Sequence, residues 1–291
     1  MIKNNVIIVE IKGGFGNQLF QFVYANELKN LGYKVYVNTR FYNYKSKETQ
    51  NNTPRNLIID EKYFGFKNIN YFLYRFILLN KKLNESRYFN NFFTNEKNKI
   101  YKKFKDSNFK EELLNAKFIH LDGYWQNNKN LLANRDYLLD SLKKIPEINS
   151  AITTKAKKGS VLVLVRRGDY LEMGEDLNLE FYKNCIDFLQ KNNNDLSFNI
   201  FTDDVNWVKS KNIFNIADKI YGPEIDSEKV ILLFCKMINH QNYIIGNSTF
   251  SFFAAFLGKE KNSQVLIADP WFRNKKYPDL YIKDWIRIEN H

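Results

Sequence analysis

A short run of apolar residues in the middle of the chain places the strongest constraint on the fold. Val161–Val165 are five consecutive apolar residues, three of them β-branched, and the run is too short to span a membrane. Such a run is typical of a strand buried on both faces of a parallel sheet. It ends in Arg166, Arg167, Gly168 and Asp169. Because open α/β sheets bind ligands beyond the carboxyl ends of their strands, the two arginines indicate a phosphate-binding site. The alternative is a pair of surface arginines in an ordinary loop.

The first half of the chain contains one βαβ unit. A strand is expected over Val6–Val9, a helix over Gln18–Leu31 and a strand over Lys34–Asn38. Residues 71–114 are rich in Lys, Asn and Phe, and we expect helices and loops there. Another strand is expected over Phe118–Leu121.

The second half alternates strands and helices more regularly, which predicts an α/β fold with a doubly wound parallel sheet. After Val161–Val165, helices are expected over Glu180–Lys191, Asp226–Ile238 and Phe250–Leu257, and strands over Ser197–Phe201, Tyr243–Ile245 and Val265–Ala268. At 291 residues, 44% of them hydrophobic, the chain is large enough for two globular domains. We place these at residues 1–155, with an irregular helical middle, and 156–291.

Two further loops follow predicted strands of the second half and carry polar side chains. Thr202–Asp204 offers hydroxyl and carboxylate groups suited to a ribose or a base. Asn247–Thr249 offers hydroxyls at the start of a helix, where free N–H groups attract an anion. Ser and Thr are also ordinary helix caps, which is the alternative for that loop. Together with the Arg166 loop, these segments indicate a nucleoside-diphosphate site.

A glycine-rich turn follows the first strand. Gly13, Gly14 and Gly16 allow the backbone to approach a ligand closely, with Asn17 and Gln18 next in sequence. The third glycine of a dinucleotide-binding fingerprint is missing, and there is no Walker-type Gly-Lys-Ser/Thr. A tight strand-to-helix turn is the simpler interpretation.

Metal-dependent chemistry has little support in the sequence. His120, His240 and His291 form no ligand spacing, and there is no Asp-x-Asp pair to hold a divalent ion on a diphosphate. We therefore expect no metal and no cofactor. Arginines, hydroxyls and a helix terminus must then neutralise the diphosphate.

Charge and cysteine content limit the partners and the compartment. The net charge of +12 favours polyanionic partners, such as phosphorylated small molecules or the anionic surface of the inner membrane. Nucleic acid is suggested by charge alone, since no recognised binding motif is present. Two unpaired cysteines, Cys185 and Cys235, and the absence of a signal peptide or membrane span favour a cytoplasmic protein, with peripheral membrane contact possible.

Five segments of the chain resemble the α-1,2-fucosyltransferases of glycosyltransferase family 11. Their counterparts in the family are Gly-Gly-x-Gly-Asn-Gln, Gly-Tyr-aromatic-Gln, His-x-Arg-Arg-Gly-Asp-Tyr, Phe-Ser-Asp-Asp with a following Trp, and Ile-Ile-Ala-Asn-Ser-Thr-Phe-Ser. In this chain they are Gly13–Gln18, Gly123–Gln126, Leu164–Tyr170, Phe201–Asp204 with Trp207, and Ile244–Ser251. They occur in family order over most of the chain, which makes the match specific.

The chain departs from the family pattern at several positions. Leu164 stands where the family usually has histidine, and Phe252 and Phe253 replace a Trp-Trp pair. The acidic residue expected to read guanine is not fixed, with Asp226 and Glu228 as candidates. These departures leave the identity of the donor sugar open.

The resemblance implies a glycosyltransferase B type fold, in which two Rossmann-like domains face each other across a cleft and the tail returns to the N-terminal domain. It also implies metal-independent transfer of L-fucose from GDP-β-L-fucose, with inversion, to the 2-hydroxyl of a terminal galactose in a bacterial O-antigen or capsule glycan. The alternatives are a transferase for another GDP-sugar, or a non-catalytic protein that binds a GDP-sugar or nucleic acid.

The resemblance and the loops together assign the site residues. Arg166 is expected to bind the β-phosphate, Asn17 to lie near the reacting centre, and Asp169 to be a candidate base or a structural residue. Arg167 is expected to brace its loop through Asp169. The residues expected to bind the donor are Gly14, Phe15, Gly16, Arg166, Arg167, Thr202, Asp203, Asp204, Asn247, Ser248, Thr249 and Phe250. Those expected to bind the acceptor are Tyr124, Trp125 and Gln126, with ordinary packing as the alternative for the two aromatic rings.

Overall fold

The chain divides into two compact units. The computed structural model describes residues 5–42, 56–76, 79, 101–105, 117–191, 193, 195–223, 227–273 and 280–290. Of these, the first unit takes those within Met1–Gly13, Asn17–Ser46 and Ile59–Ser141, and the second takes those within Gly14–Gly16, Lys47–Ile58 and Leu142–His291.

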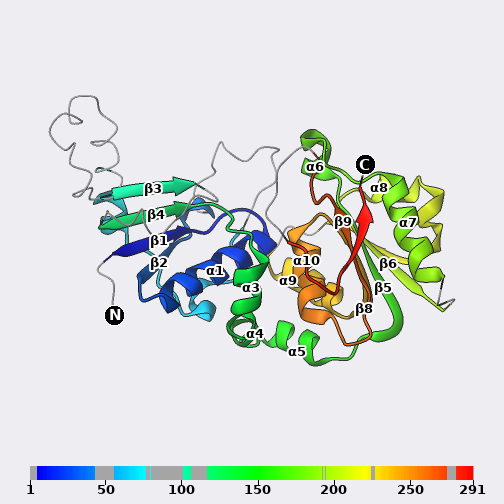
Figure 1. Cartoon of the computed structure of the whole chain (residues 1–291), viewed down its shortest axis with the longest axis horizontal. Coiled ribbons are helices and arrows are strands. Elements are labelled where there is room, and N and C mark those ends of the chain that lie inside the picture. Colours follow the sequence, from blue (N-terminus) through cyan, green and yellow to red (C-terminus); the bar gives the residue numbers. More distant parts are fainter. Residues whose placement is uncertain are drawn as a thin grey trace. The chain divides into compact units, whose positions relative to one another are not determined.

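The first unit is built on a parallel sheet of four strands in the order β2-β1-β4-β3 (Figure 1). The strands are β1 (Val6–Glu10), β2 (Lys34–Asn38), β3 (Tyr101–Lys105) and β4 (Phe118–Asp122). The helix α1 (Phe15–Asn30) connects β1 to β2, and α3 (Asn128–Ala133) and α4 (Arg135–Leu142) follow β4. Short 3-10 helices cover Arg40–Tyr42 and Glu61–Phe64. The predicted βαβ unit is therefore confirmed.

The strand β3 corrects one expectation, because residues 71–114 were expected to form helices and loops. The sequence Tyr101–Lys105 alternates aromatic residues with three lysines and lacks an apolar run. It lies at the edge of the sheet, where lysine is common because it discourages further strand pairing. A pattern of apolar residues therefore does not reveal it.

The second unit is built on a parallel sheet of six strands in the order β10-β9-β8-β5-β6-β7. These strands are β5 (Lys157–Val165), β6 (Ser197–Thr202), β7 (Ala217–Tyr221), β8 (His240–Gly246), β9 (Val265–Asp269) and β10 (Ile286–Glu289). The helices are α5 (Pro146–Thr153), α6 (Gly168–Met173), α7 (Leu179–Gln190), α8 (Val205–Lys209), α9 (Ser227–Ile238) and α10 (Thr249–Gly258), and a 3-10 helix covers Asn212–Ile216. The two parallel sheets confirm the predicted α/β class with two Rossmann-like units. That these units face each other across a cleft stays a prediction.

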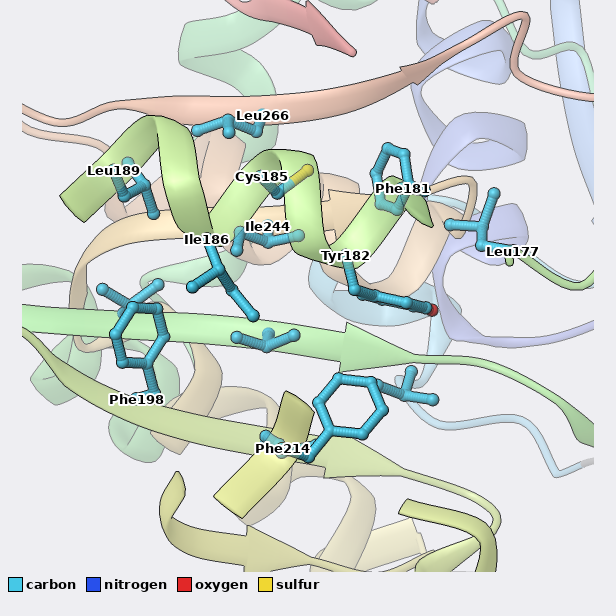
Figure 2. Packing of buried hydrophobic residues seen from close by; sticks show 14 of the residues in the cluster. Leu177, Phe181, Tyr182, Cys185, Ile186, Leu189, Phe198, Phe214, Ile244 and Leu266 are labelled. Atoms are coloured by element: carbon cyan, nitrogen blue, oxygen red, sulfur yellow. The ribbon is translucent and has the colours of Figure 1, made fainter. Parts of the chain in front are cut away.

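Helices cover both faces of the second sheet (Figure 1). On one face, α7 places Phe181, Cys185 and Leu189 against the valines of β5, with Phe198 and Leu266 from neighbouring strands (Figure 2). These positions recur at helical spacing, so α7 presents one apolar stripe to the sheet. On the other face, α10 packs against β8 and α9. All five residues Val161–Val165 are buried, as the sequence predicted.

Two features of the second unit differ from the domain limits expected from the sequence. The helix α5 packs against α9 and belongs to the second unit, whereas the division was placed after residue 155. The strand β10 extends the second sheet beside β9, whereas the tail was expected to return to the first domain. Ile286 and Ile288 alternate with charged residues and pack onto the apolar cluster under α7, which accounts for this pairing.

A buried histidine at the start of β8 makes the stability of the second unit depend on pH. Burial lowers the pKa of His240 from 6.5 to about 4, although ring Nδ1 lies 3.2 Å from the carbonyl oxygen of Met237. In the unfolded chain His240 therefore binds a proton below about pH 6.5, whereas in the folded chain it stays neutral until the pH approaches 4. Stability from this group is complete above that pH and is lost as the pH falls toward 4.

We expect the free energy of unfolding to fall by up to about 1.4 kcal/mol per pH unit between about pH 6.5 and pH 4 through this histidine. In His240→Phe, which keeps a ring beside Phe201, this contribution should disappear. Urea unfolding of both proteins at several pH values measures the difference in slope. Equal slopes would show that His240 does not carry the effect.

Candidate functional site

The loop after β5 lies where the strand order of the second sheet reverses. From β5 the chain proceeds to β6 and β7 on one side and then places β8 on the other. Doubly wound sheets bind ligands at such a point, outside the carboxyl ends of the strands. The register aligns Val165 with Thr202 on β6 and Val163 with Ile244 on β8. The loops after these three strands therefore meet at one edge, as the sequence predicted.

Two carboxylates hold the Arg166 side chain at this edge. Its Nη2 donates a hydrogen bond to Asp169 Oδ1 at 2.7 Å, and its Nη1 lies 2.7 Å from Asp203 Oδ2. The second contact is an ion pair without hydrogen-bond geometry. Burial disfavours the cation, but the carboxylates outweigh it and raise the pKa of Arg166. Within the described residues its side chain donates one hydrogen bond, so N–H groups remain for an anion.

The glycine of the Arg-Arg-Gly-Asp segment makes room for Asp203. A Cβ atom on Gly168 would lie 2.8 Å from Asp203 Oδ2, which is closer than real Cβ atoms approach an oxygen. The other oxygen of this carboxylate, Oδ1, accepts the backbone N–H of Arg167 at 2.8 Å. Asp203 thus fixes both the backbone of the loop and the position of Arg166.

The side chain of Arg167 makes three contacts that hold the loop in place. Its Nε donates to Asp204 Oδ2 at 3.3 Å, its Nη1 donates to Asp176 Oδ2 at 3.2 Å, and its guanidinium lies 3.9 Å from the centroid of the Trp207 ring. The expected bracing role is therefore present, but the expected partner was wrong. Asp169 pairs with Arg166, because the side chain of Arg167 points to the opposite side of the loop, toward α8.

Thr202 and Asp204 make hydrogen bonds within their own loop. Thr202 Oγ1 accepts the backbone N–H of Asp204 at 3.0 Å, and Asp204 Oδ1 caps α8 by accepting the N–H of Trp207 at 3.0 Å. Thr202 is buried. These contacts position the loop, and a contact of either side chain with a donor stays a prediction.

The loop Asn247–Thr249 leads into the start of α10 at the same edge. Ser248 is the N-cap residue, but its side chain makes no capping hydrogen bond. Asn247 is buried, and its Nδ2 donates to the carbonyl of Glu175 at 2.8 Å. Tyr170, from the loop after β5, donates its hydroxyl to the carbonyl of Asn247 at 3.1 Å. The simple capping alternative is thus excluded for the Ser248 side chain, and the first N–H groups of α10 face the same edge as Arg166.

The glycine-rich turn contributes Gly14–Gly16 to the second unit. A Cβ atom on Gly16 would lie 2.5 Å from the backbone of Thr249, so glycine is required for this approach. Phe15 packs edge-on against Phe234, with ring centroids 4.7 Å apart, and Phe250 completes the cluster. The structure therefore brings Gly14–Gly16 next to the start of α10, whereas their role in donor binding stays a prediction.

The first unit presents its own polar edge, where β1 and β4 lie side by side and the strand order reverses. Lys12 Nζ lies 2.5 Å from Asp122 Oδ1. Burial disfavours the Lys12 cation, but the Asp122 carboxylate outweighs it and raises the pKa. Gln126 Nε2 donates to Asn17 Oδ1 at 2.7 Å, and a Cβ atom on Gly13 would lie 2.9 Å from the ring of Tyr124. Asn17, Tyr124 and Gln126 are thus brought together.

Trp125 differs from its neighbours. It is buried, its ring stacks on Tyr24 with centroids 4.7 Å apart, and its backbone adopts a φ of 54°. The packing alternative therefore describes this ring better than a sugar platform. Tyr124 is half-buried, beside the Lys12 amino group.

Two polar pairs escaped the sequence analysis. Glu10 Oε2 lies 2.8 Å from His120 Nε2 and accepts a hydrogen bond from Asn38 Nδ2 at 2.8 Å, which links β1, β2 and β4 of the first sheet. In the second unit, Glu175 Oε2 accepts the backbone N–H of Arg273 at 2.8 Å. The position of Glu10 and His120 at predicted strand ends was the available signal, but their pairing depends on strand order.

The departures from the family pattern have different structural settings. Phe252 and Phe253 are fully buried in α10, and Phe252 packs against Trp271 and Trp285. They belong to the core of the unit. Leu164 is also buried, at the end of β5. Asp226 and the side chain of Glu228 lie outside the described residues.

Within the described part of the chain, no group of three or more His, Cys, Asp or Glu side chains could hold a metal ion. In the same residues, no helix has the length and apolar character needed to cross a membrane.

The model of glycosyltransferase family 11 matches residues 6–289. The chain belongs to this family. It is therefore a glycosyltransferase, and the resemblance inferred from the five sequence segments is confirmed.

Two curated relatives come from Escherichia coli. An α-1,2-colitosyltransferase is 26% identical over 315 residues, which cover 98% of this chain and 99% of that protein. The O-antigen biosynthesis glycosyltransferase WbnK is 25% identical over 133 residues, which cover 43% of each protein.

Solved structures of fucosyltransferases are more distant. A mutant of Arabidopsis thaliana FUT1 in complex with GDP has a TM-score of 0.46 and 11% identity, covering 90% of this chain and 70% of that one. The fucosyltransferase NodZ from Bradyrhizobium has a TM-score of 0.43 and 11% identity, covering 88% and 93%. The fold described above stands on the two parallel sheets themselves.

The space at Gly168 provides a test of the Arg166 site. In Gly168→Ala the new methyl group should displace the Asp203 carboxylate and loosen Arg166, so the rise in melting temperature on adding GDP should shrink by half or more. The fold should survive, since the φ of Gly168 suits alanine.

Gly222→Ala is a matched control, because its Cβ atom would lie 3.3 Å from a methyl group of Val205 and would have no atom of Arg166 or Asp203 within 4 Å. It should respond to GDP as the wild type does. An undiminished GDP response in Gly168→Ala would show that the position of Asp203 is unimportant for binding.

Proposed function

We propose that this glycosyltransferase transfers L-fucose from GDP-β-L-fucose to the 2-hydroxyl of a terminal galactose, with inversion and without a metal. The observation that carries the proposal is Arg166, a cation with spare N–H donors at the switch point of the second sheet, in a chain that matches family 11 from residue 6 to 289.

The donor is proposed to lie at the edge of the second sheet. Arg166 would bind the β-phosphate through N–H groups that make no hydrogen bond within the described residues, and backbone N–H groups at the start of α10, which the Ser248 side chain does not cap, would bind the α-phosphate. Asp203 and Asp169 position the guanidinium. Arg166 and the start of α10 would together neutralise the charge of the diphosphate, as a divalent ion does in other nucleotide-sugar enzymes.

The proposed reaction is a single displacement. The acceptor 2-hydroxyl oxygen forms a bond to C1 of the sugar and its proton passes to water, while the bond from C1 to the β-phosphate oxygen breaks and its electron pair leaves with GDP. Negative charge therefore grows on the departing diphosphate, and a cation fixed beforehand stabilises that charge most in the transition state. In this scheme Asp169 acts by holding Arg166, since its Oδ1 is already engaged at 2.7 Å.

The acceptor is proposed to bind at the polar edge of the first sheet. Tyr124 offers a half-exposed ring, and the hydrogen-bonded pair Gln126 and Asn17 offers amide groups suited to sugar hydroxyls. We propose a bacterial O-antigen glycan as the physiological acceptor, in keeping with the name of the relative WbnK.

Colitose is a second candidate for the transferred sugar. The relative that spans 98% of this chain is named an α-1,2-colitosyltransferase. Colitose is L-fucose without its 3-hydroxyl, so the two donors share the diphosphate and the reacting carbon. A site with fewer polar groups would accept the deoxy sugar, and Leu164 stands where the family usually has histidine.

A parallel assay of GDP-β-L-fucose and GDP-colitose with lactose, in the presence of EDTA, distinguishes these proposals. We expect an α-1,2-linked product whose linkage and anomeric configuration proton NMR identifies. Transfer from GDP-colitose alone would replace fucose by colitose. Loss of activity in EDTA that magnesium restores would refute the proposal that no metal is needed. If no GDP-sugar is transferred, the alternative of a non-catalytic binding protein would stand.

Replacement of Arg166 tests the mechanism. Arg166→Ala should lower kcat/KM by roughly a hundredfold, equivalent to about 3 kcal/mol, because the phosphate contact strengthens as GDP departs. Arg166→Lys should recover little of this loss, since an ammonium group cannot reproduce the planar guanidinium. Arg287→Ala, at an exposed arginine on β10, is the control and should keep wild-type rates. A normal rate in a folded Arg166→Ala protein would exclude the proposed role.

A further inference from the structure

A helical segment of the first unit carries large apolar side chains on its outer surface. Residues 71–76 and residue 79 are helical. Phe72 is 82% exposed and Leu79 is 56% exposed, and Tyr71, Arg75 and Phe76 are exposed beside them. We call these five residues the Phe72 stripe. A soluble helix normally turns such side chains inward, so their exposure requires an explanation.

The orientation of this helix is fixed by its other face. Leu73 and Tyr74 pack on Ile8 and Ile69 of the first unit. Phe72 and Phe76 are four residues apart on this helix and therefore lie close together, and Leu79 is a further exposed helical residue. The stripe is therefore held outward by packing and is not a frayed end.

Basic side chains lie beside the aromatic rings of the stripe. The Arg75 guanidinium lies 5.8 Å from the centroid of the Tyr71 ring. The amino group of Lys117 lies 6.0 Å from the centroid of the Phe118 ring, and that ring in turn contacts Phe76. In sequence, residues 71–105 contain nine Lys and Arg against two Glu, whereas the net charge of the whole chain is +12. This stretch of the sequence therefore carries more than half of the net charge.

We infer that the Phe72 stripe docks this protein on a lipid bilayer that contains anionic lipids. Aromatic and aliphatic side chains would enter the boundary between headgroups and acyl chains, and the basic residues would contact the headgroups. An aliphatic Leu79 in line with two phenylalanines suits insertion into lipid better than base stacking, which uses flat rings alone. This inference concerns a surface outside the donor and acceptor sites, and it does not depend on which sugar is transferred.

Co-flotation of the whole protein with vesicles tests the inference. Wild-type protein should float with vesicles of phosphatidylcholine containing about one third phosphatidylglycerol, and much less with pure phosphatidylcholine. Binding should weaken as NaCl is raised from about 0.05 to 0.5 M. The double variant Phe72→Ser, Leu79→Ser should bind roughly tenfold or more weakly, because two large side chains no longer leave water.

The matched control is Leu132→Ser, Leu232→Ser, which removes two leucines of comparable exposure, 48% and 50%, elsewhere on the surface. It should float as the wild type does. Arg75→Glu keeps the apolar stripe and should also weaken binding roughly tenfold, through charge alone. Melting temperatures establish that each variant is folded, and transfer to a soluble acceptor should be unchanged in all of them.

Several outcomes would overturn the inference. These are no flotation of the wild type, equal flotation with neutral vesicles, wild-type flotation of the Phe72→Ser, Leu79→Ser protein, or an equal loss in the control. If the stripe variants instead lose affinity for a single-stranded oligonucleotide while the wild type ignores vesicles, the surface binds nucleic acid and not a membrane.

Discussion

Burial of β5 on both faces determines where Arg166 lies, and the rest of the second unit's polar edge depends on that position. Val161, Val163 and Val165 belong to the cluster beneath α7, so a shift of the strand by one residue would remove them from that cluster and turn them to the opposite face. The register of β5 therefore fixes the position of Arg166 beside the loops that follow β6 and β8. The two carboxylates that hold it then come from a neighbouring strand and from the next turn of its own loop.

Both sheets gather charge at their switch points, but they use it differently. At the edge of the first sheet, Lys12 is closely paired with Asp122, and Glu10 with His120. The Lys12–Asp122 pair leaves little uncompensated charge at its position. At the edge of the second sheet, Arg166 keeps unused N–H groups in spite of two carboxylates. An anion can approach it without first breaking a hydrogen bond to the protein.

The sequence predicted the strands whose signal is local. Val161–Val165 and the flanking helices follow from apolar runs and helical spacing, and the Arg-Arg-Gly-Asp segment was correctly placed in the loop after a buried strand. Side-chain pairing was harder to predict. Whether Asp169 pairs with Arg166 or Arg167 depends on the direction in which each arginine leaves the turn, and Asp176 and Asp203 reach the loop only after the sheet has formed.

The strands that were missed lie at sheet edges, or are short and charged. β10 has two isoleucines that alternate with charged residues, and β3 is mostly lysine and aromatic residues. Their pairing is decided by the neighbour that each can reach in the folded unit, which a single sequence does not contain. For the same reason the sequence did not reveal that the tail adds a strand to the second sheet.

The structural setting of the family departures narrows where donor selectivity can arise. Phe252 and Phe253 lie within the core against Trp271 and Trp285, so their replacement of tryptophans is compensated by packing. Leu164 is different, because side chains two residues apart on a strand point to the same face, and Arg166 lies two residues after it. A leucine there removes a polar group beside the arginine that we propose binds phosphate, while leaving the arginine and its carboxylates in place. Any change in selectivity at this position would therefore act on the ribose or the sugar and would spare recognition of the diphosphate.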